Sequence, residues 1–226
     1  MTQARDVGLE ARDAVVWLYH NNVGKEDIMG GIGTGWFIDD THIVTNGHII
    51  DQNNEEDGSF RAITINNTSH ELEVLDYVYN INPTRDVALL KLKDGSAPHA
   101  LTLGDTNSLE EGQPLIQIGH PATIGNWLIA LGTYTGRSPG INSNSLTTEM
   151  PSYSGNSGSP LLTLDGDVVG LHYASTSENY AGDPPTPIDE DVDEARVYTE
   201  LPYQKRKSAV AEPIEDVTSH LSDWRN

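Results

Sequence analysis

The stretch Gly155-Asn156-Ser157-Gly158-Ser159-Pro160-Leu161 decides the expected fold. It places Ser157 between two glycines and then runs directly into an apolar segment. The two glycines allow a tight turn and a close approach of the backbone to a second molecule. In such a turn the N–H groups of Gly155 and Ser157 can point together at a negative charge that develops on oxygen. The same residues also suit an ordinary turn between two strands, so this stretch needs support from elsewhere in the chain.

A serine hydroxyl is an effective nucleophile only beside a base that a carboxylate orients. Both groups have candidates that precede Ser157. His48 closes Thr45-Asn46-Gly47-His48 after a short apolar strand, and Asp86 opens the apolar run 86–92. Taken alone, His48 is equally consistent with a half-buried loop histidine, and Asp86 with an aspartate that caps a turn. The chain order His, Asp, Ser is one of those described for the Ser-His-Asp triad.

These segments resemble the trypsin/chymotrypsin-fold serine proteases, and chymotrypsin has the same triad order. Within that fold, the chain is most similar to the glutamyl endopeptidases and to the protease domain of the high-temperature-requirement family. The matching stretches span most of residues 30–175, and they are Gly33-Thr34-Gly35-Trp36-Phe37-Ile38, Thr45-Asn46-Gly47-His48, Thr84-Arg85-Asp86-Val87-Ala88-Leu89-Leu90 and Gly155 to Leu161. Such motifs in the right order are far more specific together than any one of them alone.

The pattern along the chain favours an all-β protein, because short apolar segments alternate with turns rich in Gly, Pro and Asn. The resemblance implies two six-stranded antiparallel β-barrels of trypsin-like topology. We expect an N-terminal barrel over residues 1–97, a C-terminal barrel over 98–205 and a helical tail over 206–226. The turn-rich segment 93–98 is the expected link between the barrels. The tail should form a C-terminal α-helix because apolar residues recur there at helical spacing, at Ile214, Val217, Leu221 and Trp224.

The resemblance implies a serine endopeptidase that works through an acyl-enzyme. The first barrel would carry His48 and Asp86 and the second Ser157, so the active site would lie in the cleft between them. His48 would act as the base, Asp86 would orient it, and the N–H groups of Gly155 and Ser157 would form the oxyanion hole. An alternative from another class is a non-catalytic module of the same fold that binds partners.

The resemblance also implies a specificity pocket, S1, for the substrate side chain P1 that precedes the cleaved bond. Glutamyl endopeptidases have a histidine in a Gly-[Ile/Leu]-His context that contacts a substrate carboxylate, and Gly170-Leu171-His172 matches it. Ser152 and Ser175 match the small hydroxyl residues of that pocket. Pro151 stands where trypsin-like enzymes carry the aspartate that selects Lys and Arg. We therefore expect an acidic P1 residue. The alternative is a small aliphatic P1, as the high-temperature-requirement relatives imply, with His172 a core histidine.

The amino-acid composition restricts the kinds of partner that the chain can bind. The chain has 34 acidic against 13 basic residues and a formal net charge of −21, which argues against binding a nucleic acid backbone. Its apolar runs are too short for a membrane span. The absence of Cys excludes disulfides and thiolate metal sites, and no histidine spacing is typical of zinc ligands. We expect no cofactor and no metal, a protein or peptide substrate as partner, and a monomer or weak oligomer.

Two further segments concern location and calcium. Residues 1–12 are polar and lack the apolar core of an export signal. The expected location is cytoplasmic for the chain as written, and extracytoplasmic if a preceding segment has been removed. The acidic run 189–194 could bind calcium weakly. It lacks the ligand spacing of an EF-hand loop, so a solvated acidic loop is the favoured interpretation.

The charge also generates a prediction about salt. An acidic surface with only five lysines is what we expect of a protein adapted to concentrated salt, whereas an ordinary acidic protein is the alternative. Repulsion between surface carboxylates acts over about 10 Å at 0.1 M salt and about 3 Å at 1 M. The melting temperature, followed by circular dichroism, should therefore rise markedly as NaCl increases over this range. An unchanged melting temperature would contradict salt adaptation.

Overall fold

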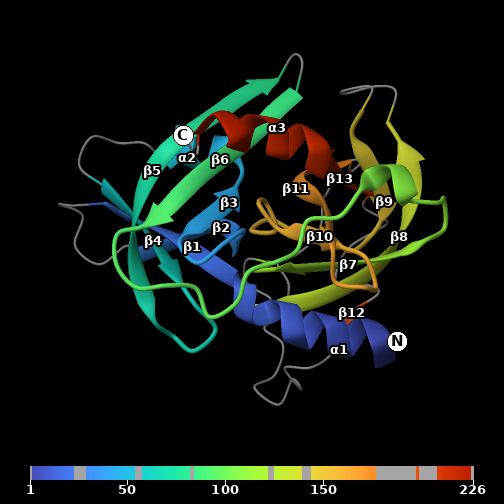
Figure 1. Cartoon of the computed structure of the whole chain (residues 1–226), viewed down its shortest axis with the longest axis horizontal. Coiled ribbons are helices and arrows are strands. Elements are labelled where there is room, and N and C mark those ends of the chain that lie inside the picture. Colours follow the sequence, from blue (N-terminus) through green and yellow to red (C-terminus); the bar gives the residue numbers. More distant parts are fainter. Residues whose placement is uncertain are drawn as a thin grey trace, which may run out of the picture.

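The computed structural model describes residues 2–22, 29–53, 58–81, 84–121, 125–138, 144–176, 197–198 and 208–224. The first half of the chain forms a closed barrel in which each strand pairs antiparallel with its neighbours, in the order β1-β2-β3-β6-β5-β4 (Figure 1). Its strands are β1 (Val15–Asn22), β2 (Met29–Phe37), β3 (His42–Thr45), β4 (Gly58–Ile63), β5 (Ser69–Ile81) and β6 (Thr84–Leu92).

The second half forms another antiparallel barrel, in the order β8-β7-β10-β11-β13-β9, which closes because β9 also pairs with β8. Its strands are β7 (Pro114–Gly119), β8 (Leu128–Arg137), β9 (Leu146–Glu149), β10 (Pro160–Leu162), β11 (Val168–Thr176) and β13 (Ser208–Pro213). The two-residue β12 (Val197–Tyr198) adds to β8 in parallel. Two closed six-stranded barrels confirm the expected all-β, trypsin-like fold.

The second barrel extends past the expected boundary at residue 205. β13 lies between β11 and β9 and is needed to close the barrel, so the helical segment begins at Ile214 and not at residue 206. The helix α3 (Ile214–Trp224) buries Ile214, Val217 and Leu221, which are three of the apolar residues at helical spacing. The other expected boundary, at residues 97–98, lies in the segment between β6 and β7.

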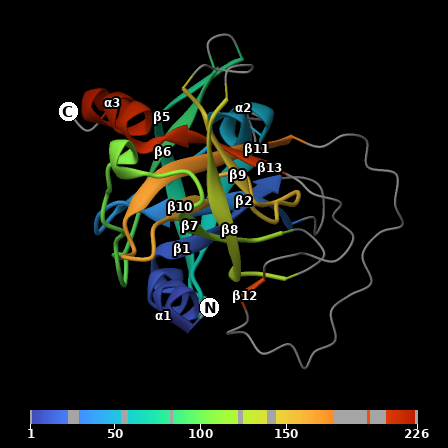
Figure 2. The ribbon, with the colours of Figure 1, turned by 90° about the vertical axis from the view of Figure 1, so that its right-hand side faces the viewer.

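A helix that the sequence did not predict, α1 (Thr2–Ala11), packs on the second barrel, beside β7 and β8 (Figure 2). Its buried side consists of Ala4, Gly8 and Ala11, and most of its other residues are polar and exposed. A Cβ atom at Gly8 would lie only 2.7 Å from Ile129 Cδ1 of β8. The helix therefore approaches the sheet closely through small residues. It also means that the start of the expected N-terminal barrel segment packs on the other barrel.

The two barrels share one apolar core in addition to their own interiors. Trp36 and Val44 of the first barrel belong to the same buried cluster as Ile118 and Leu171 of the second, and α1 and α3 contribute to it. This shared cluster packs the barrels together, which fixes the residues that line their junction. Within the described ranges, no helix is long and apolar enough to cross a membrane.

The unexpected packing of α1 can be tested with a pair of variants. Gly8→Leu should lower the free energy of unfolding by about 1–3 kcal/mol, because the added side chain must displace Ile129. Asp6→Leu, at an exposed position on the same helix, is the matched control and should have little effect. Urea unfolding measures both. Equal stability of the two variants would show that α1 does not pack on the barrel.

Candidate active site

His48 and Asp86 form a tightly bonded pair in the first barrel. His48 is the second residue of the short helix α2 (Gly47–Asn53), and Asp86 lies on β6. His48 Nδ1 lies 2.7 Å from Asp86 Oδ2, and the His48 backbone N–H donates to Asp86 Oδ1 at 2.8 Å. Both carboxylate oxygens therefore hold one residue, which fixes the orientation of the imidazole. The side chain of Asp86 is 3% exposed and that of His48 17%, so only the imidazole keeps access to solvent.

The residues just before His48 explain why the chain brings it there. A Cβ atom at Gly47 would lie 2.0 Å from the Val78 carbonyl oxygen, so glycine is required for α2 to pack this closely on β5. Asn46 is buried, and its side-chain amide donates to the Asp86 carbonyl oxygen at 2.9 Å. Thr45 donates its hydroxyl to the Thr34 carbonyl at 2.7 Å. Each residue of Thr45-Asn46-Gly47-His48 thus has a structural reason for its identity.

Ser157 lies in the loop that leads into β10 of the second barrel. Gly155 and Gly158 in this loop have φ angles of +98° and +85°, a region that favours glycine. A Cβ atom at Gly158 would lie 2.0 Å from the Thr34 carbonyl oxygen. The loop is therefore seated directly against β2 of the first barrel. The glycines that the sequence motif highlighted are needed for this contact.

Thr34, which is fully buried on β2, bonds the loop to the first barrel. Its N–H donates to the Ser157 carbonyl at 2.9 Å, and its hydroxyl donates to the Gly155 carbonyl at 2.9 Å. The same hydroxyl accepts the His120 N–H at 3.2 Å. In the part of the chain that the structure describes, the N–H groups of Gly155 and Ser157 have no hydrogen-bond partner. Sequence reasoning assigned no role to Thr34, although it lies in one of the matching motifs.

The segments that carry His48 and Ser157 both approach Gly33 of β2. At Gly33 of β2, the Cβ position would lie 2.5 Å from the side chain of Ile49, the residue after His48, and 3.1 Å from the Ser157 carbonyl. No hydrogen bond between His48 Nε2 and Ser157 Oγ is present among the described residues. Hydrogen bonds of this kind are often long without substrate and shorten when substrate binds.

Ser152, His172 and Ser175 form a hydrogen-bonded row beside the same loop. His172 Nε2 lies 3.0 Å from Ser152 Oγ, which lies 2.6 Å from Ser175 Oγ. The His172 carbonyl accepts the Gly158 N–H at 2.9 Å, so the row is attached to the loop that carries Ser157. His172 and Ser152 are buried, whereas Ser175 is exposed. Burial, with a smaller effect from the nearby His48, lowers the pKa of His172 to about 3. Its imidazole is therefore neutral at neutral pH.

Glu212 on β13 is a residue near the site that sequence reasoning missed. It is 1% exposed, and its carboxylate oxygen Oε2 accepts the backbone N–H of Asp86 at 3.0 Å. Burial raises the pKa of Glu212 to about 7, against the opposing effects of the Asp86 N–H and of Arg85. A glutamate on a short strand gives no signal in the sequence that it points inward.

His120, for which the sequence indicated no function, is also buried. Its ring contacts those of Trp17 and Trp127, at centroid distances of 5.9 and 4.6 Å. Burial lowers the pKa of His120 to about 3. Its backbone N–H donates to the Thr34 hydroxyl, which in turn donates to the Gly155 carbonyl of the loop that carries Ser157.

No group of three or more His, Asp or Glu side chains suited to hold a metal ion occurs within the described ranges. The acidic run 189–194, considered above for calcium, lies outside the described residues.

Comparison with known proteins places the chain in a family. The model for the trypsin-like peptidase domain matches residues 33–171, more than half of the chain. Similar sequences include serine protease HTRA1 of Xenopus laevis, 25% identical over 157 residues, and a probable periplasmic serine endoprotease, DegP-like, of Chlamydia pneumoniae, 29% identical over 157 residues. Both alignments cover 66% of this chain, but only 32% and 30% of the relatives. The chain thus spans about a third of their length.

Among solved structures, an HtrA-type protease, AlgW, with a decapeptide has a similar fold, with a TM-score of 0.74 and 17% sequence identity. The match covers 97% of this chain and 66% of that one. At this identity the likeness supports the fold alone. The family match over residues 33–171, together with the two-barrel architecture, shows that this chain belongs to the trypsin-like peptidase domain family and is related to the HtrA serine proteases.

Proposed function

We propose that the chain is a serine endopeptidase that cleaves protein or peptide substrates with His48, Asp86 and Ser157 as its triad. The observation that carries this proposal is the two-point contact of His48 with the buried Asp86 carboxylate. That contact holds the Nδ1–H tautomer and leaves Nε2 free to act as a base. The seating of the Ser157 loop against the same barrel supports the assignment further.

The proposed reaction proceeds through an acyl-enzyme. His48 Nε2 removes the proton from Ser157 Oγ as this oxygen attacks the substrate carbonyl carbon, and then gives that proton to the leaving amine. Water, activated in the same way, hydrolyses the ester. Asp86 stabilises the imidazolium that forms in each step. The N–H groups of Gly155 and Ser157, which lack partners among the described residues, would donate to the oxyanion.

For specificity, we propose an acidic P1 residue bound at the row Ser152, His172 and Ser175. The neutral His172 can donate its Nε2–H to Ser152, whose hydroxyl donates to Ser175. The exposed Ser175 hydroxyl is then available to donate to a substrate carboxylate. A chain of aligned hydrogen bonds strengthens its last donor.

The second candidate is the same protease with a small aliphatic P1 residue. The neutrality of His172 favours it, because the row then offers a substrate carboxylate no positive charge. In this case Ser152, His172 and Ser175 would shape the S1 pocket without bonding to the P1 side chain. The relationship to the HtrA proteases supports this candidate too.

The first functional prediction concerns the nucleophile. Ser157→Ala should keep the circular dichroism spectrum and lose nearly all peptidase activity, and Asp86→Asn should lower kcat by about 10⁴-fold through the wrong imidazole tautomer. A fluorophosphonate should label the wild type and not Ser157→Ala. Ser154→Ala, at an exposed serine of the same loop, is the control and should still be labelled.

The opposing outcomes are distinct. Labelling of Ser157→Ala would show that another residue is the nucleophile. A wild-type protein that is neither labelled nor able to cleave an unbiased peptide library would instead support a non-catalytic binding module.

The second functional prediction concerns P1. Among matched peptides with Glu, Asp, Gln, Val or Arg at P1, kcat/KM for Glu should exceed that for Gln by at least about tenfold, since a hydrogen bond to a charged group contributes about 1.5–3 kcal/mol. His172→Ala should abolish this ratio. Assays belong at both low and high salt, because an acidic enzyme repels acidic substrates at low salt. Equal or higher kcat/KM for Val would exclude the acidic preference and leave the protease assignment intact.

A further inference from the structure

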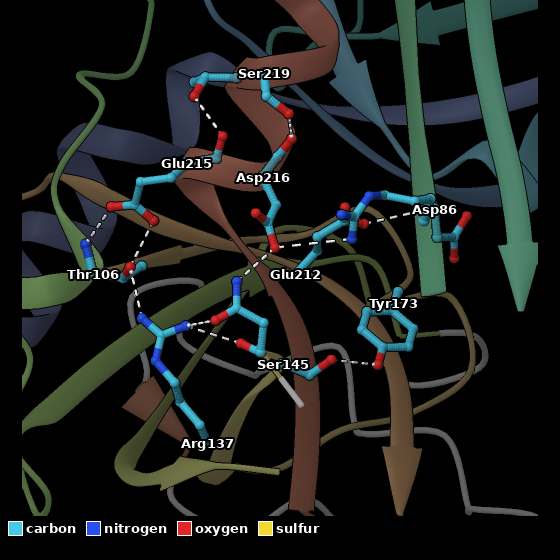
Figure 3. Close-up of polar contacts among 12 residues, drawn as sticks. Asp86, Thr106, Arg137, Ser145, Tyr173, Glu212, Glu215, Asp216 and Ser219 are labelled. Carbon is cyan, nitrogen blue, oxygen red and sulfur yellow. Dashed lines mark hydrogen bonds and ion pairs between the residues drawn. The ribbon is translucent and has the colours of Figure 1, made fainter. Parts of the chain in front are cut away.

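Glu212 makes a direct polar link between the two barrels at the position of Asp86. It lies on β13 of the second barrel, whereas Asp86 lies on β6 of the first. The hydrogen bond from the Asp86 N–H to Glu212 Oε2, at 3.0 Å, crosses from one barrel to the other (Figure 3). It holds the main chain of the same residue whose side chain orients His48. Any shift of Glu212 would therefore move the Asp86 carboxylate relative to the imidazole.

The carboxylate of Glu212 is not fully paired. Its other oxygen, Oε1, is buried and has no hydrogen-bond partner among the described residues. Burying a carboxylate oxygen without a partner costs free energy, and apolar side chains usually occupy such positions. The residue opposite Glu212 on β11 is Leu171, which has no polar group to offer. The packing of the strand alone therefore does not explain why the chain has a glutamate here.

The charged groups around Glu212 come from β6 and α3. They are Arg85 and Asp86 on β6, and Asp216 on α3. The Arg85 guanidinium lies 4.0 Å from Asp216 Oδ2, so its positive charge is shared between two acidic residues. The side-chain amide of Asn144, just before β9, donates to Asp216 Oδ2 at 2.7 Å (Figure 3). The Asp216 carboxylate is therefore bonded to the second half of the chain as well as to Arg85. Glu212 thus lies among two other carboxylates and one shared cation.

We propose that Glu212 is a positioning residue for the triad, which holds Asp86 in line with His48 and whose charge adjusts how readily His48 takes up a proton. This inference rests on the proposed function of His48, Asp86 and Ser157.

The charge of Glu212 changes in the range of a protease assay, because its pKa is raised to about 7. Above that pH the ionised carboxylate adds a second negative charge beside Asp86, and this favours the imidazolium form of His48. Below it, the neutral carboxyl can still accept the Asp86 N–H but no longer adds charge. An uncharged residue at position 212 would remove this stabilisation of the imidazolium.

Two substitutions separate the hydrogen bond from the charge. Glu212→Gln keeps an acceptor for the Asp86 N–H and removes the charge, whereas Glu212→Leu removes both at similar volume. The matched control is Glu215→Gln on α3, because Glu215 is also a bonded carboxylate near this junction but contacts Thr106 instead of Asp86 (Figure 3). The measurements are kcat and KM across the pH range, and the imidazole titration of His48 by NMR in a Ser157→Ala background.

Glu212→Gln should move the acid limb of kcat/KM, and the NMR titration of His48, to lower pH by at least about half a unit. Its kcat on the plateau should stay close to that of the wild type. Glu212→Leu should lower kcat by at least about tenfold with little change in KM, because the Asp86 N–H loses its partner and the Asp86 carboxylate its alignment. Glu215→Gln should leave both pH curves in place.

An acid limb and a His48 titration that stay unchanged in Glu212→Gln would overturn the inference, as would equal shifts in Glu215→Gln. Because the NMR titration needs no turnover, it tests Glu212 even if the protein proves inactive. Failure of the wild type to react with a fluorophosphonate would count against the proposed function and not against the electrostatic coupling. If Glu212→Leu does not fold, Glu212→Gln still decides the question.

Discussion

The hydrogen bond from the Thr34 N–H to the Ser157 carbonyl is the contact on which the arrangement of the site depends. His48 and Ser157 lie on different barrels, so only contacts between the barrels set their relative position. The Thr34 hydroxyl adds bonds to Gly155 and His120, and an unsatisfied buried partner of either bond would cost about 1–3 kcal/mol. Gly33 and Gly158 allow this close approach because each would otherwise place a Cβ atom against the opposite segment. One requirement thus explains glycines in two motifs far apart in the sequence.

Polar and apolar contacts have different effects at the junction between the barrels. The shared apolar cluster, which includes Trp36 and Leu171, holds the barrels together by the hydrophobic effect, which has little directional preference. The hydrogen bonds of Thr34 and Glu212 supply direction, because each tolerates only a narrow range of distance and angle. Apolar packing alone would permit small rotations between the barrels. Such rotations would separate the proposed nucleophile from its base.

Much of this architecture could be predicted from local sequence pattern. The apolar run 114–119 predicts a strand with the bounds that β7 has, and the spacing of Ile214, Val217 and Leu221 predicts the buried side of α3. α1 could not be predicted in this way, because it packs through alanine and glycine and so lacks an apolar stripe. β13 could not be predicted either, because its apolar pattern is very short and ends at Glu212 and Pro213.

The candidate site could also be predicted only in part. The residues Ser152, His172 and Ser175, named from a family resemblance, are brought into one hydrogen-bonded row, although their proposed role in P1 recognition stays a prediction. The roles of Thr34 and Glu212 could not be predicted, because they depend on hydrogen-bond partners more than one hundred positions away in the sequence. Neither residue type signals such a partner by itself.

Near the proposed triad, burial favours the neutral form of both a basic and an acidic side chain. It lowers the pKa of His172 to about 3 and raises that of Glu212 to about 7, because both groups lose hydration that favours their charged forms. A neutral His172 does not repel the imidazolium that His48 must become during turnover. While Glu212 is protonated, it adds no second negative charge beside Asp86. In a chain with a net charge of −21, burial thus favours the neutral forms of His172 and Glu212 close to the His48–Asp86 pair. The positive charge that develops during the proposed reaction forms on His48, where Asp86 can stabilise it.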